Sequence, residues 1–159
     1  MANPAAESKR LQVINRIVSV LQGILAGSDF WYTPGEVAKR FKHWSECTKF
    51  PTYMVFSSSG GEIAYAGEMQ YDETFYVSVK GIVQDNLDTV TKLERSIRDI
   101  RKAINDDSIS PNAGTLGALA VQVRIDEPPE TDDGYLSLEG FGFFDQKIRC
   151  VISGDFGEL

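Results

Sequence analysis

The chain has 159 residues, 42% of them hydrophobic and 25% charged, with a net charge of −7 at neutral pH. These proportions are ordinary for one globular domain, and 9 Phe, 6 Tyr and 2 Trp supply enough apolar surface to exclude a wholly disordered chain. Two cysteines far apart in sequence make no disulfide framework, and no stretch reaches the ~20 apolar residues of a membrane helix. We therefore predict a single domain over residues 1–159, made in the cytoplasm and without a membrane partner.

A first helix is predicted over residues 5–26. Its apolar positions recur three or four residues apart, at Leu11, Ile14, Val18, Leu21 and Leu25. A second apolar stripe lies beside this one, and a face this wide is typical of a helix packed on a sheet. Asn3-Pro4 is a suitable start for the helix, and Gly27 can end it in a left-handed conformation.

In the middle of the chain, the sequence pattern indicates strands less clearly. Residues 28–51 have no clear period and could be strand, helix or loop. Residues 52–57 are β-branched and aromatic and predict a strand, after which 57–61 (SSSGG) predict a loop or hairpin turn. The clearest strand covers 74–83, where alternating apolar and polar residues are typical of a half-buried antiparallel strand.

A second helix is predicted over residues 86–105, capped by Asp85 or Asn86 and ended by Asn105-Asp106-Asp107. Its apolar stripe consists of Val90, Leu93, Ile97, Ile100 and Ile104. A polar linker at 106–115 and a strand at 116–125 follow. Two more strands, 135–144 and 147–153, are expected to pair around Asp145-Gln146. Because strands and helices do not alternate, we predict an α+β fold with a mixed, mainly antiparallel sheet and helices on one side.

Charge is unevenly distributed along the chain. Nine acids and two bases lie within residues 126–159, so this segment carries the whole imbalance, and residues 126–134 form a long acidic loop. An acidic segment argues against nucleic-acid binding. The second helix carries a basic face at Lys92, Arg95, Arg98 and Lys102. This face is either simply solvated, or it contacts the acidic residues of an adjacent copy head to tail, namely Glu130, Asp132 and Asp133.

The residue types that carry catalysis are scarce. Any Cys–His arrangement would have to use His43, the single histidine, with Cys47, and the pattern favours a surface histidine and a partly buried thiol. Two Cys and one His cannot close a structural zinc site, and neither a calcium loop nor a phosphate loop is present. We therefore predict no catalytic residue, no metal and no cofactor, and a protein that is not an enzyme.

The order and texture of five segments are similar to a known family. These are the helix RLQVINRIVSVLQGIL, the strand KFPTYMVF, the strand ETFYVSVKGIV, the helix end DIRKAI, and the acidic closing segment ETDDGYLSLEGFGFFDQKIRCVI. Together they resemble the tail terminator, or tail-completion, proteins of long-tailed bacteriophages, over residues 10–153.

The resemblance implies a structural virion protein at the junction of tail and neck. Such a subunit would form a ring, a hexamer in this family, that caps the tail tube, ends its elongation and joins the tail to the head connector. Its partners would be itself, the tail tube protein and a neck or head connector protein, and DNA would pass the acidic channel without specific binding. Two alternatives remain open: another neck or minor tail protein, and a small cytosolic α+β enzyme or ligand-binding module with a pocket near His43, Trp44 and Cys47.

Overall fold

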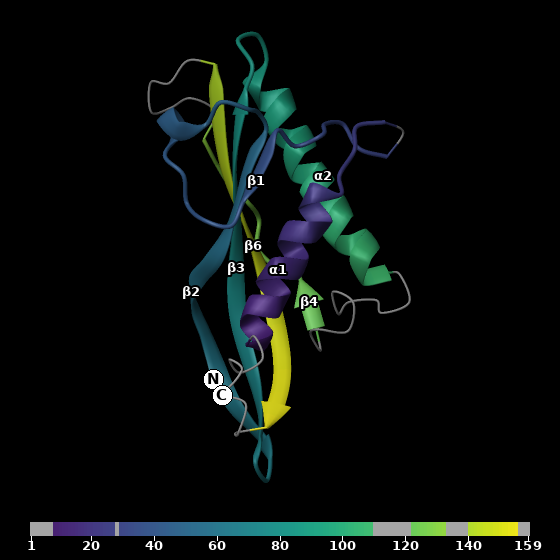
Figure 1. Ribbon diagram of the computed structural model, residues 1–159, viewed down its shortest axis with the longest axis vertical. Coiled ribbons are helices and arrows are strands. Elements are labelled where there is room, and N and C mark those ends of the chain that lie inside the picture. The colour runs from purple at the N-terminus through teal and green to yellow at the C-terminus, as the bar shows by residue number, and fades with distance from the viewer. Residues whose placement is uncertain (1–7, 28, 110–121, 133–139, 156–159) are drawn as a thin grey trace, which may run out of the picture.

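The computed structural model describes residues 8–27, 29–109, 122–132 and 140–155, which fold into one sheet and two long helices (Figure 1). In chain order the elements are α1 (Lys9–Gln22), β1 (Glu36–Ala38), the 3-10 helix η1 (Trp44–Glu46), β2 (Thr52–Gly67), β3 (Gln70–Gln84), α2 (Thr89–Ile109), β4 (Gln122–Arg124), β5 (Glu130–Asp132) and β6 (Phe141–Asp155). Within the described residues, no helix is both long and apolar enough to cross a membrane.

The sheet is mixed and mainly antiparallel, as predicted. Its strand order is β1-β2-β3-β6-β4, and β5 also pairs with β6. Only β1 runs parallel to its neighbour β2, whereas β2, β3 and β6 form long antiparallel pairs. β4 and β5 pair with different stretches of β6. The α+β fold class is therefore confirmed, and both helices lie on one side of the sheet (Figure 1).

The main core lies between the helices and one face of the sheet. Both helices pack on the apolar face of β3, formed by Phe75, Val77, Val79 and Val83. The predicted stripes are confirmed only in part, because Leu25 and Val90 are 69% and 51% exposed, and α1 buries residues of its adjacent stripe instead. The opposite face of β3 is also covered at one end, where Ile82 packs with Met54 and Cys47 in a smaller apolar cluster. The 39–50 segment therefore acts as a partial cover on the face that has no helix.

α1 is shorter than predicted. The Ser8 hydroxyl accepts a hydrogen bond from the Leu11 amide and caps the helix start, while the Asn3-Pro4 start lies outside the described residues. The helix ends at Gln22 rather than near Gly27. Beyond that point the chain leaves the helix but still buries Ile24 in the core.

α2 is shifted toward the C-terminus relative to the prediction. Asp85 accepts hydrogen bonds from two amides of the following turn, and Asp88 then caps the helix by accepting from Thr91. Asn105-Asp106-Asp107 does not stop the helix, which continues to Ile109. Acidic groups near a helix C-terminus oppose the helix dipole, but here Asp106 pairs with Lys102 and Asp107 with Arg16. The expected 106–115 linker is thus helical to 109, and its remainder lies outside the described residues.

The predicted loop at 57–61 is wrong, because β2 runs through it. The strand register shifts between Ser58 and Glu62, and Gly60 and Gly61 adopt φ angles of 101° and 103°. A Cβ on Gly61 would lie 2.1 Å from the Thr74 carbonyl oxygen. The two glycines form a bulge rather than a turn, and the hairpin turn comes later, between Gly67 and Gln70.

The predicted break at Asp145-Gln146 is also wrong. β6 is one continuous strand, and Asp145 and Gln146 both lie within it. Gln146, fully buried, accepts a hydrogen bond from Arg101 and donates to two main-chain carbonyls. Of the strand predicted at 116–125, the described part is β4, and the predicted acidic loop contains β5. Residues 110–121 and 133–139 lie outside the described residues.

Candidate functional site

A cleft of about 430 Å³ opens on the face of the sheet that has no helix. Its lining residues come from four separate parts of the chain: Phe41–Trp44, Lys80–Ile82 of β3, Glu130–Asp132 of β5, and Phe143–Asp145 of β6, together with Met54 of β2. The cleft therefore lies where the 39–50 segment and β5 approach the same strands from two sides.

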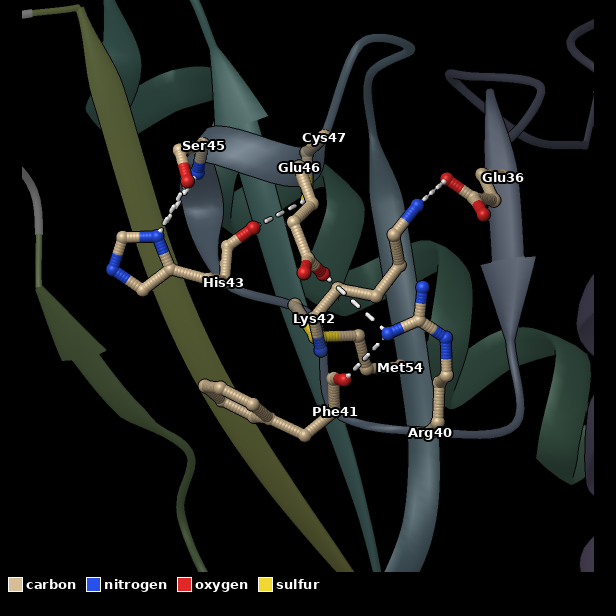
Figure 2. A network of polar contacts seen from close by, with 9 residues as sticks. All are labelled: Glu36, Arg40, Phe41, Lys42, His43, Ser45, Glu46, Cys47 and Met54. Carbon is tan, nitrogen blue, oxygen red and sulfur yellow. Dashed lines mark hydrogen bonds and ion pairs between the residues drawn. The ribbon is translucent and has the colours of Figure 1, made fainter.

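His43 lines the cleft, but it does not form a pair with Cys47. The Cys47 thiol is 8% exposed and donates to the main-chain carbonyl of His43 at 3.6 Å. The His43 ring is exposed, and its Nδ1 lies 2.7 Å from the Ser45 hydroxyl. The imidazole points away from the thiol (Figure 2), so the geometry offers no thiolate–imidazole pair for nucleophilic catalysis.

The side chains of residues 40–43 alternate between the two sides of this segment (Figure 2). Lys42 is 8% exposed, and its ammonium donates to Glu36 on β1 at 2.6 Å. In Figure 2 the Lys42 ammonium points toward β1, while the rings of Phe41 and His43 point to the opposite side. The Lys42–Glu36 ion pair thus anchors the segment to the sheet and leaves the aromatic rings at the cleft.

Lys80 and Asp145 face one another across β3 and β6 in the cleft. Their charged atoms, Nζ and Oδ2, are 4.0 Å apart. The same ammonium lies over two aromatic rings, 5.7 Å from the centroid of Phe41 and 5.6 Å from that of Phe56. The other carboxylate oxygen of Asp145, Oδ1, is buried and has no hydrogen-bond donor among the described residues.

Two of the predicted acidic contact residues border this cleft. Glu130 and Asp132 belong to β5, and Glu130 pairs in register with Asp145. Asp133 lies outside the described residues. Sequence reasoning missed Lys80, which reads as an ordinary strand residue, and Asp145, which reads as part of a turn. Only the pairing of β3 with β6 brings them together.

The four basic residues of α2 contact the chain's own aromatic segment. Lys92, Arg95 and Lys102 lie over the rings of Tyr32, Trp31 and Phe30, with Arg95 only 3.9 Å from the Trp31 centroid. Arg98 donates to the Asp29 carbonyl. The basic face is therefore ordered within the subunit, and Arg98 remains half exposed.

Asp99 holds this aromatic segment on α2. It is completely buried and accepts hydrogen bonds from the main-chain amides of Trp31, at 2.9 and 3.1 Å, and of Tyr32, at 3.0 Å. The buried hydroxyl of Tyr53 is close by, and burial raises its pKa above its ordinary value. The local sequence carries no sign that Asp99 is buried, because it lies among the basic residues of α2.

Among the described residues, no group of three or more His, Cys, Asp or Glu side chains could hold a metal ion. The second thiol, Cys150, is fully buried in the main core, and this burial raises its pKa to about 12. No protein-family model matches the chain, and no curated protein matches it significantly. The function is therefore argued from the surfaces described above.

Proposed function

We propose that the protein is a structural virion subunit, a tail terminator whose copies form a ring that caps the tail tube and joins the tail to the head connector. Glu130 and Asp132 lie at the cleft on the open sheet face, whereas the basic residues of α2 lie in the helix layer with the 29–32 segment. Complementary charges on different faces of one subunit suit a head-to-tail contact, which closes into a ring when the rotation allows.

The long hairpin of β2 and β3 supports the same proposal. It extends beyond the N-terminal end of α1 (Figure 1). It carries three exposed apolar side chains, Ile63, Tyr65 and Met69, which are 53–81% exposed. Large exposed apolar groups on a projecting element are typical of a contact surface. In the proposed ring this hairpin would contact a neighbouring subunit or the tube, at the tail–neck junction of the virion.

The head-to-tail contact can be tested by mixing two charge-reversed variants. One carries Glu130→Lys and Asp132→Lys, and the other carries Lys92→Glu and Arg95→Glu. Each variant alone opposes like charges at every contact, so self-association should be lost. In an equal mixture every contact regains opposite charges, so rings with alternating subunits should form.

The readout is the mass by light scattering over a range of protein and salt concentrations, after circular dichroism has shown that both variants keep the wild-type fold. Reversal of Lys147 and Arg124, exposed or half-exposed cations away from both patches, is the matched control and should leave the mass unchanged. A wild-type chain that stays monomeric, and that also fails to bind the tail tube protein of the same genome, contradicts the proposal.

A second candidate function, a ligand-binding module, is favoured by one observation, the cleft beside His43 and Trp44. If the protein acts through a pocket, His43→Ala should remove ligand binding while assembly stays intact. If the protein is a ring subunit, the same substitution should be nearly silent in assembly.

A further inference from the structure

We propose that the cleft between the 39–50 segment and β5 is a receptor for one basic side chain, a lysine or an arginine, presented by a partner protein. A contact at Glu130 and Asp132 would thus bind a cationic side chain, whether or not the protein forms a ring. A test with small probes therefore fails or succeeds independently of self-association.

The charges around the cleft favour a cation. Three carboxylates line it, those of Glu130, Asp132 and Asp145, against the ammonium groups of Lys42 and Lys80. The Lys42 ammonium is bound to Glu36, which is not part of the lining. The lining as a whole carries three carboxylates against two ammonium groups, a formal excess of one negative charge, which attracts a positively charged group.

The shape and the apolar part of the cleft favour a cation on a long aliphatic stem. Phe41, Trp44 and Phe143 provide aromatic surface, and Phe41 and Trp44 remain 58% and 37% exposed. Arginine and lysine bury their methylene stems on apolar surface while the charged end stays among polar groups. Aromatic faces also attract the cation itself, and arginine stacks on them best.

The cleft already contains an example of the interaction. Lys80 places its ammonium over Phe41 and Phe56, and it approaches only Oδ2 of Asp145. The distance of 4.0 Å is longer than a hydrogen bond. One internal cation therefore leaves the Asp145 carboxylate incompletely paired, and its buried Oδ1 has no donor among the described residues. The Asp145 side chain is 17% exposed, and a second cation with several N–H donors would pair with this exposed part of the carboxylate.

A partner protein is the favoured source because the cleft opens onto a broad protein surface. It adjoins the face of the sheet that no helix covers, and its rim consists of exposed aromatic side chains. Exposed aromatic residues around a charged centre are typical of protein contact surfaces, where one desolvated anchor is surrounded by weaker contacts.

The experiment titrates isotope-labelled protein with capped tripeptides, Gly-Arg-Gly and Gly-Lys-Gly, and follows the indole N–H signals by NMR. The chain has two tryptophans, so Trp44 reports the cleft and Trp31, which packs against Arg95 of α2, is an internal control. The neutral tripeptides Gly-citrulline-Gly and Gly-norleucine-Gly match the two probes in shape. We expect saturable shifts of Trp44 alone with the basic peptides, with a dissociation constant on the order of 1 mM for a single side chain.

Three variants locate the cation. Asp145→Asn should weaken binding about tenfold through loss of a charge-assisted contact. Glu130→Gln, a change at an exposed residue that should not affect folding, should weaken binding roughly two- to fivefold. Lys80→Met keeps the stem but removes the competing ammonium, so binding should become roughly two- to fivefold tighter. The matched control is Lys147→Met, on the same sheet face outside the cleft, and it should have no effect.

Several results would overturn the proposal. Equal shifts with the norleucine peptide would make the cleft a general apolar site, and weaker binding by Lys80→Met would show that the ammonium attracts an anion instead. Absence of any Trp44 shift at soluble peptide concentrations would remove the site altogether. If free spermidine bound about tenfold more tightly than either basic peptide, the cleft would be a site for a small polyamine and not for a partner protein.

Discussion

Replacement of Asp99 by Asn tests whether one buried carboxylate holds the 29–32 segment on α2. The carboxylate is fully buried and accepts hydrogen bonds from two main-chain amides, those of Trp31 and Tyr32. Hydrogen bonds to a charged acceptor contribute about 1.5–3 kcal/mol each. Oδ2 accepts from both amides, so an asparagine oxygen in its place makes only weaker neutral bonds of about 1 kcal/mol each. The NH₂ group then replaces Oδ1, where it faces the Trp31 amide and the Arg98 guanidinium instead of accepting from them. We therefore expect Asp99→Asn to lower the free energy of unfolding by about 2–4 kcal/mol.

The assay is urea unfolding monitored by circular dichroism, combined with amide hydrogen exchange. The Trp31 and Tyr32 amides should become less protected in the variant, because a neutral oxygen is a weaker acceptor than the carboxylate. Asp106→Asn is the matched control, since its ion pair with Lys102 is half exposed, and it should cost no more than about 0.5 kcal/mol. An Asp99→Asn protein within 0.5 kcal/mol of the wild type, with both amides still protected, would refute this account of the segment.

Three further substitutions test the packing, the helix cap and the buried thiol. A Cβ on Gly81 would lie 2.1 Å from a buried phenylalanine ring of β6, so Gly81→Ala should lower the free energy of unfolding in urea by about 1–3 kcal/mol. Gly27 has open space around it, so Gly27→Ala should be nearly neutral. Equal effects of the two substitutions would contradict this packing. Hydrogen bonds from Thr91 lower the pKa of Asp88 below its ordinary value of 3.8. The Asp88 cap therefore stabilises the fold above pH 3.8, and this stabilisation is lost as the pH falls through the folded-state pKa. The difference in unfolding free energy between wild type and Asp88→Ala should narrow in acid, and a difference that widens would be inconsistent with the cap. Burial raises the pKa of Cys150 to about 12. In a Cys47→Ser protein, Cys150 should therefore react with a thiol reagent at pH 8 only as fast as the protein unfolds. Labelling at the rate of a free thiol would show that β6 is open at this position.

The parts of the fold that were predicted correctly are those with a local pattern. The alternation in β3 and the stripes of both helices follow directly from which residues must face the core, so the two helices, the antiparallel sheet and the one-sided packing were all expected. The predictions that were wrong rest on local sequence patterns that fit more than one structure. Two adjacent glycines indicate a turn or a bulge equally well, and only the register of β2 against β3 decides for the bulge.

Long-range pairings account for the other differences. Gln146 remains in a continuous strand because Arg101, 45 positions away, satisfies it. The segment at 28–51 had no period of its own, and part of its conformation is imposed by Asp99, 67 and 68 positions from the amides it binds. The cleft likewise combines four stretches of chain, so none of its charge pairs has a local signature in the sequence.

The aromatic contacts on α2 also change what the basic face can do. In isolation, a long cationic side chain loses rotamer entropy when it forms an intermolecular contact. Here Arg95 is stacked on Trp31 at 3.9 Å, and Arg98 is held by the Asp29 carbonyl. Stacking uses the flat face of a guanidinium and leaves its in-plane N–H groups available for a carboxylate. Much of the ordering cost is therefore met when the subunit folds, so a basic face that is already engaged within the chain is better prepared, not less available, for an acidic neighbour.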